Sequence, residues 1–180
     1  FVDLGLSVMW ATSNLGAEEP CDSGKYYFWG NIYDITHPQG AKENKEIKNK
    51  RENLFSNFER IYGDCRWDAA TAHMGYPWRM PQEYELDELK NKCNWELTYV
   101  NSQYCYKVTG PNSNSIFLPA AGYMSEGSLY NAGSGGYYWS SSLHTDNPYY
   151  SYYVNFFSDS VVWNYYYFRY YGFTVRPVCK

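Results

Sequence analysis

The residue types that most often carry out chemistry are present in this chain, but they are scattered. The five cysteines are Cys21, Cys65, Cys93, Cys105 and Cys179, and no two of them form a CxxC pair. Free cysteine usually behaves as a small buried hydrophobic residue, so we expect most of these thiols to be structural. One disulfide remains an open alternative, and the odd count leaves at least one thiol unpaired within the chain.

The three histidines, His37, His73 and His144, are isolated in the sequence. A zinc site needs three or four ligands that converge on one point, and no histidine here has another ligand at a suitable spacing. The sequence therefore predicts neither a metal site nor another cofactor.

One stretch has the composition of a binding surface. Gly136–Phe173 holds eleven of the twenty-two tyrosines, with six serines and three asparagines, and contains no Lys, Glu, Gln or Met. Each buried phenol hydroxyl needs a hydrogen-bond partner and lowers stability without one, so many of these rings should face solvent or a ligand. Tyr, Ser, Asn and Gly also dominate antibody paratopes. We therefore interpret this stretch as a ligand-binding surface.

The bulk composition argues against several classes of protein. At 180 residues the chain suits one domain, residues 1–180, with a core of its own. A net charge of −4 argues against a nucleic-acid partner or an anionic membrane surface. We find no run of eighteen apolar residues, so no membrane-spanning segment is predicted. The chain opens on FVDLG without Met, so its ends do not indicate localisation.

Two segments in the first half have helical patterns. Trp67–Met74 predicts a short helix, and Pro81 stands where a first helical turn accepts proline, before QEYELDELKNKCN. In that second segment Leu86, Leu89 and Cys93 fall at i, i+3 and i+7 and form one apolar stripe. Its acidic residues come first and its lysines last, which complements the helix dipole. We therefore expect a helix here.

The other patterns predict strands, turns and one charged excursion. The alternating charges of Ala41–Phe55 favour a solvated helix or an excursion from the core. Glycine content predicts a loop at Gly122–Gly136, and Asn164–Phe168 has no period and is predicted as a loop. Two helices followed by antiparallel strands imply an α+β domain. Strands are expected at residues 1–12, Lys25–Gly30, Trp95–Tyr99, Tyr104–Val108, Ile116–Leu118, Tyr137–Ser142, Tyr152–Phe157, Val161–Trp163 and Phe173–Val178.

Alternation along the late strands separates core from surface. Val154 and Phe156 are the better core residues, which turns Tyr153 and Phe157 outward. By the same rule Val161 and Trp163 point inward, and Ser160, Val162 and Asn164 point away. Consecutive residues cannot all enter one core, so Tyr165, Tyr166 and Tyr167 are expected to be exposed. We assign Tyr137, Tyr138 and Trp139 to the core.

Seven motifs are distributed along the chain: FVDLGL followed by WAT, then YYFWG, DAATA, WRMP before a helix, GPNSNSIFLPAAGY, YWSSSL and GFTVRPV. Together they resemble the variable proteins of bacterial and phage diversity-generating retroelements, over essentially the whole chain except the charged run. The resemblance implies a C-type lectin fold, of the branch similar to formylglycine-generating enzymes. Two helices would pack on short antiparallel strands, with paired terminal strands and extensive loops.

The resemblance also implies how the site arises. In this family a reverse transcriptase rewrites adenines in a template copy, so that AAY codons scatter over many residues but cannot yield Lys, Glu, Gln, Met or Trp. From Ser140 to Phe173 only Trp163 belongs to that set. By resemblance, residues 136–173 are the variable ligand-binding region, residues 1–135 the scaffold and residues 173–178 the closing strand.

The implied function is non-enzymatic binding of an unknown protein ligand on a cell or phage-host surface. A broad tyrosine-rich face suits a protein better than a small molecule, which usually occupies a concave pocket. Rings such as Tyr166 would be anchors, and Asp146, Ser160 and Asn164 polar contacts. The implied location is extracellular, on a bacterial surface or a phage virion. The expected ligand-facing residues are Asp146, Tyr149, Tyr150, Tyr153, Phe157, Ser160, Val162, Asn164, Tyr165, Tyr166, Tyr167, Phe168 and Tyr171.

Two other functions stay open. A calcium-dependent lectin would carry Trp-Asn-Asp where this chain has Trp163, Asn164 and Tyr165, and the missing carboxylate is one that calcium needs. Sugar binding on tyrosine without calcium remains an alternative. A formylglycine-generating-type oxidase needs neighbouring reactive cysteines late in the fold, but after Cys105 only Cys179 remains, which makes this the weaker alternative.

Overall fold

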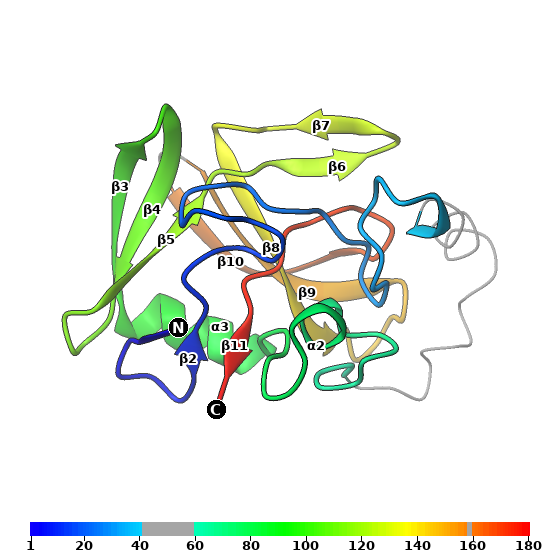
Figure 1. Cartoon of the computed structure of the whole chain (residues 1–180), viewed down its shortest axis with the longest axis horizontal. Coiled ribbons are helices and arrows are strands. Elements are labelled where there is room, and N and C mark those ends of the chain that lie inside the picture. Colours follow the sequence, from blue (N-terminus) through cyan, green and yellow to red (C-terminus); the bar gives the residue numbers. More distant parts are fainter. Residues whose placement is uncertain (41–59, 158–159) are drawn as a thin grey trace.

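The structure, a computed structural model, describes residues 1–40, 60–157 and 160–180, and only the backbone of residues 160–165. The predicted excursion at residues 41–55 lies outside the described residues. Within them, helices accompany small antiparallel sheets (Figure 1), which confirms the predicted mixture of α and β structure. None of the described helices is long and apolar enough to cross a membrane.

Both predicted helices form. Helix α2 spans Ala69–Met74, and helix α3 spans Glu83–Lys92. The apolar stripe of α3 faces inward as predicted, because Leu86 and Leu89 are buried and Cys93 is half-buried.

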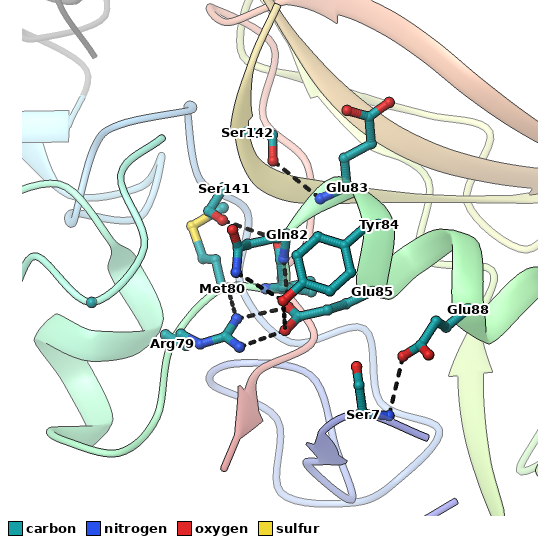
Figure 2. A network of polar contacts seen from close by, with 12 residues as sticks. Ser7, Arg79, Met80, Gln82, Glu83, Tyr84, Glu85, Glu88, Ser141 and Ser142 are labelled. Carbon is teal, nitrogen blue, oxygen red and sulfur yellow. Dashed lines mark hydrogen bonds and ion pairs between the residues drawn. The ribbon is translucent and has the colours of Figure 1, made fainter. Parts of the chain in front are cut away.

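A buried ion pair fixes the start of α3 (Figure 2). The two guanidinium Nη atoms of Arg79 lie 2.7 and 2.5 Å from the carboxylate oxygens of Glu85, and Glu85 also accepts the Gln82 N–H at 2.8 Å. The Ser142 hydroxyl accepts the Glu83 N–H at 3.1 Å. Removing one partner of such a buried pair typically costs about 3–5 kcal/mol. The Glu83–Ser142 hydrogen bond joins the start of the helix to the strand that carries Ser142.

The strands of the described residues form three three-stranded sheets and one hairpin. The sheets are β1 (Val2–Asp3), β2 (Met9–Trp10) and β11 (Val178–Cys179); β3 (Asn94–Val100), β4 (Gln103–Thr109) and β5 (Ser115–Pro119); and β8 (Gly135–Leu143), β9 (Tyr150–Phe157) and β10 (Ser160–Phe168). Strands β6 (Tyr123–Ser125) and β7 (Ser128–Tyr130) pair as the hairpin.

The two ends of the chain meet in the first sheet (Figure 1). Trp10 of β2 lies opposite both Val2 of β1 and Val178 of β11. Arg176, just before β11, is buried and donates to the backbone carbonyls of Ala11 and Thr12 at 3.1 and 2.8 Å. Burial lowers the pKa of Arg176 to about 10, so the guanidinium remains charged at neutral pH. The WAT and RPV motifs are therefore structural contacts between the chain ends.

Several predicted boundaries are wrong. The opening strand is two short strands, β1 and β2, and Lys25–Gly30 contributes only two isolated bridges of Tyr27, one to Asp34 and one to Phe173. Tyr27 and Phe173 exchange backbone hydrogen bonds at 2.9 and 3.1 Å, so these extended segments pair at one point without forming a ladder. The closing strand is correspondingly short, since β11 begins only at Val178.

Two segments predicted as loops are strands. Gly122–Gly136 contains the β6–β7 hairpin, and Asn164–Phe168 is the second half of β10. Tyr166 and Tyr167 pair with Tyr152 and Ser151 of β9. Consecutive rings are compatible with a strand because successive side chains lie on opposite faces of the sheet, and here both faces offer aromatic neighbours.

The β8–β9–β10 sheet separates two hydrophobic clusters. The first contains Leu86 and Leu89 of α3 with Tyr138, Val154 and Phe156. The second contains Trp29, Ala70, Trp139, Tyr153 and Phe173. Glycine is required at residue 136 of β8, because a Cβ added there would lie 2.2 Å from Cζ of Phe156. The prediction that Tyr137, Tyr138 and Trp139 are core residues is confirmed, since all three are buried.

Candidate functional site

The tyrosine-rich stretch forms one sheet with two different faces. Alternation sends Tyr138, Val154 and Phe156 to the face covered by α3, and Tyr137 and Tyr153 to the opposite face. On the α3 face the phenol of Tyr138 is fully satisfied, because its hydroxyl donates to the Pro119 carbonyl at 2.7 Å. Burial raises its pKa, so this ring is a neutral scaffold residue.

The opposite face contains a small cavity of about 140 Å³, which we call the tyrosine cavity. Phe173 is buried among the aromatic residues of this cavity. Its ring centroid lies 5.0 to 6.1 Å from the ring centroids of four tyrosines, Tyr123, Tyr137, Tyr153 and Tyr167. The rings come from the β6–β7 hairpin, the sheet and the segment before β11, so the fold assembles the cavity from distant parts of the sequence. The lining residues are Tyr123, Tyr137, Tyr153, Asn155, Tyr167 and Phe173.

Tyr153 corrects one prediction. The sequence places this side chain outward, but only 8% of it is exposed. The reason is that the sheet is covered on both faces: Tyr153 packs 5.0 Å from Phe173 and 5.8 Å from Tyr167, measured between ring centroids. Alternation therefore assigns Tyr153 to the correct face of the sheet, but other aromatic side chains cover most of that face.

Asn155 is the polar member of the tyrosine cavity. It is 8% exposed, and no donor among the described residues forms a hydrogen bond with its buried Oδ1 atom. A buried amide oxygen without a partner costs about 1–3 kcal/mol. The fold tolerates that cost at a residue that lines a cavity, which makes Asn155 the unusual feature of this site.

Three phenols of the tyrosine cavity, those of Tyr123, Tyr137 and Tyr167, have raised pKa values and are uncharged at neutral pH. Burial is the largest cause that raises the pKa of Tyr123 and of Tyr137, although the Asn131 amide, which donates to the Tyr137 hydroxyl at 2.8 Å, opposes the shift of Tyr137. Burial and the neighbouring Tyr171 raise the pKa of Tyr167 to about 12. The cavity is therefore a neutral aromatic environment.

A second group of rings lies on the α3 face, where β9 begins; we call His144, Tyr150, Tyr152, Tyr166 and Phe168 the outer cluster. The rings of Tyr166 and His144 are 4.2 Å apart, and Tyr150 lies 5.1 Å from Tyr166 and 4.5 Å from Phe168. Tyr166 is 46% exposed. This cluster therefore offers aromatic surface directly to solvent.

The remaining predicted site residues are distributed around these two groups. Asp146 and Tyr149 are exposed on the connection between β8 and β9, and Phe157 and Tyr171 are half-buried beside the tyrosine cavity. Ser160, Val162, Asn164 and Tyr165 belong to β10, but their side chains lie outside the described part of the structure, as do those of Val161 and Trp163. Of the predicted residues whose side chains the structure describes, Tyr153 and Tyr167 belong to the tyrosine cavity, and Tyr150, Tyr166 and Phe168 belong to the outer cluster.

Sequence reasoning missed several members of both groups. Tyr123 lies in the segment predicted as loop, while Tyr137 and Phe173 were assigned to scaffold. Asn155 had a usable signal, since alternation places it on the same face as Tyr153. No sequence pattern indicated that His144 would contact Tyr166.

The five cysteines do not form a disulfide. Cys21 and Cys105 are buried next to one another, which their spacing did not indicate, and all five cysteines are free thiols. Burial is the largest cause that raises the pKa of Cys105, so its thiol stays protonated at neutral pH. Across the described residues, no three His, Cys, Asp or Glu side chains gather as a metal site would require.

A larger cavity, of about 420 Å³, lies away from the tyrosine-rich sheet. Its lining includes Phe1, Asn14, Lys25, His73 and Trp78. None of the described residues that line it contributes a buried polar atom without a partner, in contrast to Asn155 in the tyrosine cavity.

A family model described as a domain of unknown function, DUF8237, matches residues 67–178. The chain belongs to this family. The DUF8237 segment begins before α2 and ends at the first residue of β11, so it contains both aromatic groups and the whole β8–β9–β10 sheet. Neither the curated proteins nor the solved structures yielded a match.

The residues before the DUF8237 segment complete its core. Trp10 belongs to the first hydrophobic cluster, and Trp29 to the second. The indole N–H of Trp29 donates to the Ser140 carbonyl at 2.8 Å, and the indole N–H of Trp139 donates to the Tyr27 carbonyl at 2.9 Å. The N-terminal segment therefore supports the sheet directly.

Proposed function

We propose that this DUF8237 member is a non-enzymatic binding protein of the diversity-generating retroelement type, with a C-type lectin fold and an extracellular protein partner. The observation that carries the proposal is the concentration of tyrosines from one short stretch on both faces of the β8–β9–β10 sheet. Small antiparallel sheets, helices α2 and α3, and the pairing of β2 with β11 are compatible with that fold.

The arrangement of the exposed rings favours a protein partner. Tyr149 and Tyr166 are 39% and 46% exposed, and Tyr166 is supported from beneath by His144 and Tyr150. Aromatic side chains that are held in place contribute binding area at low entropic cost, and tyrosine is enriched among the residues that dominate binding energy. The tyrosine cavity, at about 140 Å³, is well below the roughly 300–1,000 Å³ of sites for drug-sized ligands.

A binding experiment tests the proposal. The wild-type protein is screened without calcium against purified bacterial surface proteins and, in parallel, against a glycan array. Any ligand found is then measured with the double variant Tyr149→Ala/Tyr166→Ala and with Tyr99→Ala, a matched exposed tyrosine on the β3–β4 hairpin.

We expect a protein ligand whose affinity falls at least about tenfold in the double variant and stays unchanged in Tyr99→Ala, since a binding hot spot contributes about 2 kcal/mol or more. Equal affinities of the two variants would place the binding surface elsewhere. A glycan ligand without a protein ligand would favour the calcium-independent lectin.

Diversification is tested independently at the gene. We expect a nearby near-copy of the DNA for Ser140–Phe173 that differs only at adenines, together with a reverse transcriptase gene. A complete locus that lacks both would remove the retroelement part of the proposal and leave the binding role standing.

A further inference from the structure

The tyrosine cavity combines aromatic walls with a single amide. Four tyrosines and Phe173 supply the rings, and Asn155 supplies the amide. The planes of Tyr123 and Tyr137 are inclined by 64°, and those of Tyr153 and Tyr167 by 62°. Aromatic faces attract organic cations electrostatically, and tyrosine is among the better rings for this contact.

Asn155 provides the cavity with an acceptor atom that needs a hydrogen-bond donor. Its Oδ1 atom is buried without a partner among the described donors, while the side chain itself lines the cavity. An amide oxygen accepts hydrogen bonds and does not donate them, so a ligand must bring a donor to complete Asn155. An N–H group on the ligand would then satisfy the atom that the protein leaves unpaired.

Charge and size restrict the ligand further. The lining contains no cationic side chain, so nothing in the lining repels a cation. The tyrosine-rich stretch contains no lysine, and its one arginine, Arg169, is buried. A cavity of about 140 Å³ accepts the end of a side chain rather than a whole drug-sized molecule.

We propose that the tyrosine cavity receives an N–H-bearing organic cation, the end of a basic side chain on the protein partner. The rings would contact the cation through their π electrons, and the Asn155 amide oxygen would accept one of its N–H groups. This assignment deepens the proposed function and depends on it, because it names the chemistry by which the sheet recognises its partner.

Three small probes separate the contributions. n-Butylammonium has both a charge and N–H donors, tetramethylammonium has the charge alone, and 1-butanol has a donor without a charge. Each is titrated into the full chain while the Asn155 side-chain amide and the tyrosine ring resonances are followed by NMR. We expect n-butylammonium to bind at least about tenfold more tightly than either other probe, because 1-butanol lacks the charge that the rings attract and tetramethylammonium lacks an N–H group for the Asn155 oxygen.

Two variants locate the site. Asn155→Leu keeps the apolar packing but removes the acceptor, and we expect it to bind n-butylammonium no better than tetramethylammonium. Tyr99→Ala, on the β3–β4 hairpin and outside the cavity, should leave the affinity for n-butylammonium unchanged. Thermal unfolding of each variant confirms that it is folded, and the probe comparison on the wild-type protein needs no variant.

Three outcomes would overturn the assignment: 1-butanol binding as tightly as n-butylammonium, a methyl glycoside shifting these resonances while the cation does not, or no response to any cation. Such a failure is distinguishable from failure of the proposed function. A protein ligand that depends on Tyr149 and Tyr166 would still establish the binding role, while the tyrosine cavity would be a packing defect.

Discussion

The tyrosine cavity and the outer cluster lie on opposite faces of the same three strands, yet they use tyrosine in different ways. In the cavity, Tyr153 and Phe173 are buried in the second hydrophobic cluster, so these rings support the fold as well as line a site. In the outer cluster, Tyr166 is supported from one side and open on the other. Position relative to the covering elements, rather than residue type, decides which tyrosine is scaffold and which is available surface.

The largest predicted effect is at the base of the cavity. Phe173 is 1% exposed and contacts all four cavity tyrosines, so Phe173→Ala should lower the free energy of unfolding by about 3–5 kcal/mol. Urea denaturation monitored by circular dichroism measures the change. Phe168→Ala, in the half-buried outer cluster, is the matched control and should cost clearly less. Equal losses would mean that the two groups contribute equally to the core.

Asn155→Leu should raise the free energy of unfolding, whereas Phe173→Ala should lower it. The substitution replaces a buried amide oxygen that has no partner among the described residues with an apolar group of similar size, so stability should rise by about 1 kcal/mol. The midpoint of chemical denaturation measures it, with Asn131→Leu as control, because the exposed Asn131 donates to the Tyr137 hydroxyl and its loss should not stabilise. A destabilised Asn155→Leu protein would show that the amide is satisfied after all.

The tyrosine cavity should also make stability depend on alkaline pH. The pKa of Tyr167 is raised from 10.0 to about 12, so its neutral form is favoured in the folded state. Its contribution is therefore present below pH 10 and is lost as pH rises toward 12, because the unfolded chain ionises first. Melting temperatures of wild type and Tyr167→Phe across this range measure the effect. The variant should lose less stability with rising pH, and parallel curves would contradict the assignment.

The sequence predicts the helices and strands better than it predicts which other segments pack over them. The apolar spacing of Leu86 and Leu89 identifies α3, and alternation assigns Tyr153 and Asn155 to a common face of β9. Both patterns are local. Neither says what lies above that face, because Tyr123 reaches it from the β6–β7 hairpin and Phe173 from the segment before β11. Tyr166 could be predicted as exposed, whereas the closed environment of Tyr153 depends on tertiary contacts that no local pattern contains.

The smallest effect is expected at Tyr166, the residue that most directly distinguishes surface from scaffold. Tyr166→Ala removes a ring that is 46% exposed and contacts His144 and Tyr150 at its inner side, so stability should change by no more than about 0.5 kcal/mol. Tyr153→Ala, on the cavity face of β9, is the matched substitution at a buried ring and should cost several times more. Both are measured by chemical denaturation. If Tyr166→Ala lowered stability as much as Tyr153→Ala, Tyr166 would be a core residue. The outer cluster would then have no aromatic surface that is free to bind a partner.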